Sequence, residues 1–132
     1  SLTVFLEIHE PGDLVPLHAH RAVETFFVLR GQGIFHCDGE EVIIRTGDCL
    51  MIPLRGKHDF SNPGPGRLYL LTVMVPNATF VEQVRAGIPA PLDAEDLQVL
   101  RSGVGETPSH AESQRPVSRR RDHSLKSNTD RP

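Results

Sequence analysis

The sequence contains no tryptophan and one tyrosine, and aromatic residues make up only 5% of its 132 residues. No apolar run approaches the ~20 residues that a membrane-spanning helix needs, so we expect no membrane partner. The formal net charge is only −3, and this balance argues against a nucleic-acid partner. A single domain is therefore expected, with a core built mainly from Val, Leu, Ile and the six Phe residues.

Cysteine is also scarce, since Cys37 and Cys49 are the only two. The sequence shows no secretory signal, so we expect reduced, buried thiols that pack as small apolar groups rather than a disulfide. For the same reasons we expect a cytoplasmic protein.

Short apolar segments separated by turn residues run from residue 2 to residue 75. The first segment alternates, and its apolar face consists of Leu2, Val4, Leu6 and Ile8. Further strands are expected within residues 24–30, 33–39, 41–45, 48–52 and 67–75. The stretches RGQG (30–33) and DGEE (38–41) are typical of hairpin turns, because Gly tolerates the positive φ of such turns. The pattern predicts an antiparallel sandwich or barrel over residues 1–76.

The periodicity changes after Pro76, where residues 77–101 predict one or two short helices packed on the outside of the barrel. Thr79 and Glu82 have the spacing of a capping box, and Gly87 is suited to the end of that helix. A second short helix is expected around residues 93–100.

Residues 102–132 are poor in apolar side chains and rich in Ser, Pro and Arg. Such a segment cannot bury enough apolar surface to offset the entropy of ordering it, so a disordered tail is predicted. The three arginines at 119–121 are interpreted as solvated charge rather than as a nucleic-acid contact.

Two histidines and a glutamate lie close together in the stretch PGDLVPLHAHRAVE (11–24). Side chains two residues apart in a strand point the same way, so His18 and His20 are expected to face one point. Glu24 begins the next strand and can return to that point. A fourth ligand is needed, and His58 is the best candidate because it lies at the start of a returning strand.

These residues carry a resemblance to the cupins, whose two sequence motifs are met here with the right spacings. The first motif is matched by Gly12, His18, His20, Glu24 and Gly31, and the second by Gly47, Pro53, His58 and Asn62. One position departs from the pattern: Arg55 stands where the second motif has a glycine. The resemblance covers residues 2 to about 75.

The resemblance implies an all-β, double-stranded β-helix fold, which is a jelly-roll barrel, with the short helices and the tail appended. It also implies that His18, His20, Glu24 and His58 bind one divalent metal inside the barrel. Imidazole and carboxylate ligands suit Mn, Fe, Ni, Co, Cu or Zn rather than Ca or Mg. An octahedral ion would keep two positions open for a small polar molecule. A homodimer formed through outer strands is implied as well.

Alternation along the strands places Phe26, Val28 and Phe60 on the same faces as the ligands, either as a pocket wall or as plain core. His36 and Tyr69 are weak candidates for a catalytic acid or base, although packing or surface roles are the simpler interpretation of both.

Two functions remain open from the sequence. The first is a small metalloenzyme, either a dioxygenase or an isomerase or lyase, that acts on a small polar molecule. The second is a non-catalytic module in which the metal holds a small ligand for binding or sensing.

Overall fold

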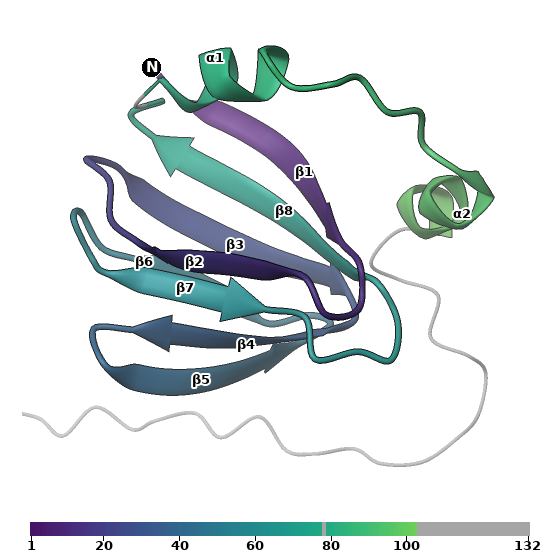
Figure 1. The fold of residues 1–132 in the computed structure, drawn as a ribbon, viewed down its shortest axis with the longest axis horizontal. Coiled ribbons are helices and arrows are strands. Elements are labelled where there is room, and N and C mark those ends of the chain that lie inside the picture. The colour runs from purple at the N-terminus through teal and green to yellow at the C-terminus, as the bar shows by residue number, and fades with distance from the viewer. Residues whose placement is uncertain (78, 103–132) are drawn as a thin grey trace, which may run out of the picture.

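The protein is described here by a computed structural model that covers residues 1–77 and 79–102. Figure 1 shows a β-barrel with two short helices beside it. The elements are β1 (Thr3–His9), β2 (Leu14–His18), β3 (Val23–Arg30), β4 (Gln32–Cys37), β5 (Glu40–Arg45), β6 (Cys49–Ile52), β7 (His58–Ser61), β8 (Leu68–Val75), α1 (Phe80–Arg85) and α2 (Ala94–Ser102). Residues 103–132, including most of the predicted disordered tail, lie outside the described residues.

The strands form two antiparallel four-stranded sheets that face each other. One sheet has the order β1-β8-β3-β6 and the other has the order β2-β7-β4-β5. Strands that follow one another in the chain often lie in opposite sheets, which is the winding of a double-stranded β-helix. The predicted all-β jelly roll with short C-terminal helices is therefore confirmed.

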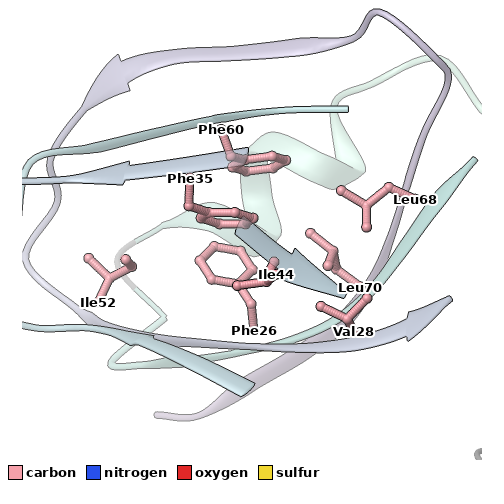
Figure 2. Packing of buried hydrophobic residues seen from close by; sticks show 8 residues of the cluster. All are labelled: Phe26, Val28, Phe35, Ile44, Ile52, Phe60, Leu68 and Leu70. Carbon is pink, nitrogen blue, oxygen red and sulfur yellow. The ribbon is translucent and has the colours of Figure 1, made fainter. Parts of the chain in front are cut away.

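The core lies between the two sheets and is dominated by three phenylalanines (Figure 2). Phe35 and Phe60 are stacked with ring centroids 4.7 Å apart, and Phe26 packs at an angle to both. The strands alternate inward and outward residues, and the cluster is built from inward-facing side chains of both sheets. The buried aliphatic members of the cluster are Val28, Ile44, Ile52, Leu68 and Leu70.

One of the two predicted hairpin turns is right and the other is wrong. Asp38 and Gly39 both have positive φ angles, 48° and 89°, and they join the paired strands β4 and β5. The RGQG stretch instead links β3 to β4, which belong to different sheets. Gly31 in this crossing has φ 96°, and a Cβ atom there would lie 2.6 Å from the carbonyl oxygen of Arg67. The glycine therefore permits a close crossing of chains, not a hairpin.

The helix α1 is capped differently from the prediction. Asn77 Oδ1 accepts hydrogen bonds from the hydroxyl of Thr3 at 2.7 Å and from the backbone N–H of Val81 at 3.1 Å. Asn77 also donates through Nδ2 to the carboxylate of Glu82 at 3.2 Å. The role predicted for Thr79 thus belongs to Asn77, which ties the start of α1 to β1.

The helix α2 is held at the opposite end of the β1–β8 pair (Figure 1). Asp96 is only 6% exposed and accepts hydrogen bonds from the buried hydroxyl of Tyr69 at 2.9 Å and from the Arg67 guanidinium at 3.2 Å. Arg67 also contacts Glu10 and Asp93. The backbone N–H of Asp96 and the Arg67 guanidinium lower the pKa of Asp93.

The outer face of the first sheet is apolar. The residues predicted to share the apolar face of the first strand do so, but that face points away from the barrel, and β1 is an edge strand. Val4, Met51 and Val75 are 52%, 62% and 46% exposed, and Leu71 is 36% exposed. Because one side of this sheet carries the core, these side chains are left at the surface.

The prediction of two buried thiols is half wrong. Cys37 is partly buried and packs against the core, whereas Cys49 is exposed because it faces outward from β6. Both cysteines are free. No helix among residues 1–77 and 79–102 is both long and apolar enough to span a membrane.

Candidate metal centre

Three imidazoles converge at one end of the barrel. His18 ends β2, His58 begins β7, and the two are direct partners in the ladder between these strands, with ring centroids 4.2 Å apart. His20 follows β2, outside any strand, with its ring centroid 5.2 Å from that of His58. One nitrogen from each ring can be chosen so that the three atoms lie within 4.8 Å of one another. This spacing is suited to one metal ion.

The reason predicted for this convergence is only partly correct. Strand alternation was expected to align His18 and His20, but β2 ends at His18 and has an irregular register after Val15. The backbone N–H of Arg55 instead donates to the carbonyl oxygen of His20 at 3.1 Å. This contact, made from the loop before β7, holds the segment that carries His20.

Arg55 has φ 65°, the left-handed conformation that glycine adopts most easily. The turn before His58 therefore keeps the shape that a glycine at this position would favour, although the residue is an arginine. A non-glycine residue in this region costs free energy, which contacts around the loop such as the bond from Arg55 to His20 help to offset.

Hydrogen bonds to backbone carbonyls determine which imidazole nitrogens of His18 and His58 are free to bind a metal. His18 Nδ1 donates to the carbonyl oxygen of Pro16 at 2.8 Å, and His58 Nδ1 donates to that of Gly56 at 3.0 Å. A carbonyl oxygen can only accept, so each neutral ring carries its proton on Nδ1 and keeps its lone pair on Nε2. Backbone acceptors of this kind commonly orient histidine ligands of metals.

Glu24 lies between two of the imidazoles. Its side chain points inward from β3, it is 4% exposed, and Oε2 accepts a hydrogen bond from His20 Nε2 at 2.8 Å. The same oxygen lies 3.3 Å from His58 Nε2, without a hydrogen bond between the two atoms. Burial lowers the pKa of His58, but the Glu24 carboxylate and the Gly56 carbonyl more than compensate, so the pKa is raised.

Two buried nitrogens of this cluster, His20 Nδ1 and His58 Nε2, have no hydrogen-bond partner among the described residues. A buried polar atom without a partner costs about 1–3 kcal/mol, so proteins rarely retain one without a use. Nitrogen lone pairs beside a carboxylate are the donors that a transition metal prefers. The residues present therefore fit a divalent transition metal.

A cavity of about 240 Å³ borders this cluster on the side of His18, His20 and Glu24, and the buried His58 does not line it. It is lined by His18, Ala19, His20, Glu24, Met74, Phe80 and Gln83. The predicted wall residues Phe26, Val28 and Phe60 are not among these; they are buried in the core, which was the alternative interpretation (Figure 2). Of these three core residues, only Phe26 has a ring contact with His58, and the two centroids are 6.5 Å apart.

The two candidate acids or bases lie elsewhere. His36 faces outward from β4, where Nδ1 is 2.7 Å from Asp59 Oδ1 and Nε2 is 3.2 Å from Glu41 Oε2. These carboxylates, Asp59 first, raise the pKa of His36. Tyr69 is buried under α2, and burial raises the pKa of its hydroxyl. Neither side chain lines the metal-site cavity.

Sequence reasoning missed four lining residues, Ala19, Met74, Phe80 and Gln83, and one neighbour of the ligands. Met74 could have been found by alternation, because it is the ladder partner of Glu24. Phe80 and Gln83 belong to α1, and no sequence pattern indicates that this helix reaches the barrel mouth. Cys37 lies opposite His58 in the ladder between β4 and β7, so its side chain is on the same face.

The cupin-domain family model matches residues 5–74, more than half of the chain, so the chain belongs to the cupin family. The resemblance inferred from the two motifs is thereby confirmed. Residues 5–74 contain all four candidate metal ligands.

Two relatives come from Thermotoga maritima. One is named oxalate-binding protein and is 35% identical over 66 residues, which are 49% of this chain and 54% of the relative. The other is a crystal structure described as a predicted oxalate decarboxylase, with 32% identity, a TM-score of 0.52, and coverage of 54% of this chain and 63% of that one. The chain thus spans between half and two thirds of their lengths.

A second similar structure is described as a putative sugar phosphate isomerase from Acidithiobacillus ferrooxidans. It has 28% identity and a TM-score of 0.52, with coverage of 55% of this chain and 49% of that one. Proteins with quite different described activities therefore resemble this barrel, and the barrel alone does not define a reaction.

Proposed function

We propose that this cupin binds one divalent transition metal through His18, His20, Glu24 and His58, and that the metal holds a small oxygen-bearing molecule in the cavity. The observation that carries the proposal is the convergence of three imidazoles beside a buried carboxylate, with two buried nitrogens left without partners. When bound, the metal would supply a Lewis acid with open coordination positions.

The size of the cavity limits the ligand. About 240 Å³ lies below the usual range of roughly 300–1,000 Å³ for ligand pockets, so the site suits a molecule of few atoms. The relative named oxalate-binding protein makes oxalate the first candidate. A small dicarboxylate offers paired oxygens, which are good donors for a divalent ion.

Binding without turnover is the function that the geometry supports best. The lining residues other than the candidate ligands are Ala19, Met74, Phe80 and Gln83, none of which exchanges protons near neutral pH. A general acid or base must lie within hydrogen-bond reach of the reacting atom. Neither His36 nor Tyr69 lines the cavity, which weakens the case for isomerase, lyase or dioxygenase chemistry that uses them.

A metalloenzyme is the second candidate, and the position of Glu24 favours it. Its carboxylate is buried next to the open side of the imidazole cluster and lines the cavity. It could therefore take a proton from a bound molecule if it is not occupied as a ligand. The described activities of two similar structures, oxalate decarboxylase and sugar phosphate isomerase, are compatible with this alternative.

The protein is also proposed to be a homodimer. The apolar outer face of the first sheet, with Val4, Met51, Leu71 and Val75 exposed, supports this proposal. Exposed apolar patches on the face of a sheet commonly mark an association surface.

The proposed function is tested by loading metal-free protein separately with Mn, Fe, Co, Ni, Cu and Zn. Elemental analysis then gives the metal content, and calorimetric titration with oxalate gives the affinity. Bound metal with oxalate binding and unchanged oxalate supports a binding module, whereas carbon dioxide or formate among the products supports an enzyme. Wild-type protein that retains none of the six metals contradicts the site.

A further inference from the structure

We propose that α1 forms the outer wall of the ligand site and that Gln83 is its specificity-determining residue, hydrogen-bonding the part of the ligand that points away from the metal. This inference rests on the proposed metal-dependent binding and goes beyond it, because it assigns a role to a helix outside the residues that the cupin-domain model matches.

The helix α1 lies beside the cavity. Phe80 and Gln83 line the same cavity as His18, His20 and Glu24. Residues three apart in a helix lie on one face, so both side chains face the cavity together. The remaining lining residues come from the barrel, and α1 supplies the wall on the side away from them.

The helix α1 is held there independently of the candidate ligands. The ring of Phe80 stacks on that of Phe5 in β1, with centroids 4.7 Å apart and planes 26° apart. Asn77 connects the start of the helix to Thr3 and Val81 by hydrogen bonds. Contacts with β1 therefore set the position of the helix, and these contacts do not depend on a bound metal or ligand.

The fold does not require Gln83. No residue of α1 is buried, so the helix adds little to the core. Gln83 is exposed, and its side chain can change without loss of packing. The position of α1 is therefore better explained by a role at the cavity than by a contribution to the stability of the core.

The chemistry of the Gln83 side chain suits ligand recognition. Among the lining residues, Gln83 is the only polar side chain that is not a candidate metal ligand. Its amide offers two N–H donors and one acceptor oxygen and carries no charge. Phe80 and Met74 make the rest of the non-ligand wall largely apolar. The site therefore favours a small carboxylate that binds the metal with some oxygens and presents another oxygen to Gln83.

Oxalate and acetate are the two probes that test this selectivity. Oxalate carries oxygens on both carbons, so oxygens remain for Gln83 when others bind the metal. Acetate ends in a methyl group and has no second oxygen pair. The discriminating variants are Gln83→Leu, which keeps similar bulk without the amide, and Arg85→Ala, a matched control on the same helix whose side chain does not line the cavity.

The experiment measures metal content and then titrates the metal-loaded proteins with each probe by calorimetry. We expect Gln83→Leu to keep the wild-type metal content and acetate affinity, but to bind oxalate about tenfold more weakly, as the loss of one ligand hydrogen bond predicts. Arg85→Ala should match wild type in all three measurements.

The outcomes separate this inference from the proposed function. Wild-type protein without metal contradicts the proposed function and, with it, the inference. Metal-loaded wild type that does not bind oxalate overturns the proposed ligand class. Metal-loaded wild type that binds oxalate, with Gln83→Leu binding it equally well, overturns the role of Gln83 while the metal site stands.

Discussion

The Nδ1 atom of His58 donates a hydrogen bond to the carbonyl oxygen of Gly56 at 3.0 Å. This contact leaves Nε2 of the same ring as a buried lone pair without a hydrogen-bond partner among residues 1–77 and 79–102. The loop before β7 therefore prepares His58 to bind a metal, since a fixed tautomer needs no rearrangement when the ion arrives.

The first prediction is that His58→Ala lowers metal content well below the value of about one ion per chain expected for wild type. The ligand sits on a strand of the preformed barrel, so circular dichroism should show the fold retained. His36→Ala is the matched control, because that imidazole faces away from the cavity. Elemental analysis of both variants makes the comparison, and equal metal content in wild type and His58→Ala would show that His58 is not a ligand.

The second prediction concerns Glu24, whose carboxylate contacts both His20 and His58. Glu24→Gln keeps the size of the side chain but removes its charge. We expect metal affinity to fall at least about tenfold, which is the smallest effect typical of losing a residue that orients a ligand. The affinity should fall further if Glu24 itself binds the metal. Competition with a chelator of known affinity measures the change, and undiminished affinity would exclude both roles.

Much of the barrel was predictable, because most strands show apolar segments and most turns contain a glycine. The assignment failed where two strands adjacent in sequence belong to different sheets, as at Gly31. A glycine reports that the backbone needs unusual space or φ, but not whether the reason is a hairpin or a crossing. The partner that decides this, the carbonyl of Arg67, is distant in sequence.

The convergence of the candidate ligands was also predictable, since their spacing follows two family motifs. The cavity wall was not, because Phe80 and Gln83 reach it only through the stacking of Phe80 on Phe5. His36 and Tyr69 were candidates on residue type alone. Their side chains are occupied by Asp59 and Asp96, contacts that depend on how distant strands and helices pack.

The third prediction is that Tyr69→Phe destabilises the protein by about 1 kcal/mol, the typical net contribution of one hydrogen bond. The lost bond is the one from the buried hydroxyl to Asp96 of α2, while Arg67 continues to contact Asp96. Urea unfolding measures the change. The double variant with Asp96→Ala, which removes the acceptor, should be less destabilised than the sum of the two single variants, and strict additivity would show that the two side chains do not interact.

The fourth prediction concerns pH. The carboxylates of Asp59 and Glu41 raise the pKa of His36 in the folded protein above its ordinary value of 6.5. Stabilisation by this group is therefore fully present below pH 6.5 and is lost as the pH rises through the folded-state pKa. The urea midpoint of wild type should exceed that of His36→Gln more at pH 5.5 than at pH 9. A constant difference at both pH values would contradict the raised pKa.

The fifth prediction tests the proposed homodimer. Leu71 lies in β8, inside the first sheet, and its outward side chain is 36% exposed between Leu6 of β1 and Phe27 of β3. A lysine there would place a charge at the centre of the apolar face, where burying it without a partner is costly. Leu71→Lys should therefore be monomeric in analytical ultracentrifugation at concentrations where wild type is dimeric.

The control for this test comes from the other sheet. Ile43 is an outward-facing residue of β5 with 47% exposure, so Ile43→Lys introduces the same charge on a surface that the proposed dimer does not use. We expect this variant to sediment as wild type does. A stable interface usually buries at least about 1,200 Å² in total, so one lysine at its centre disrupts it while one outside leaves it intact. If Ile43→Lys were monomeric and Leu71→Lys dimeric, the interface would lie on the second sheet and the proposed location would be wrong.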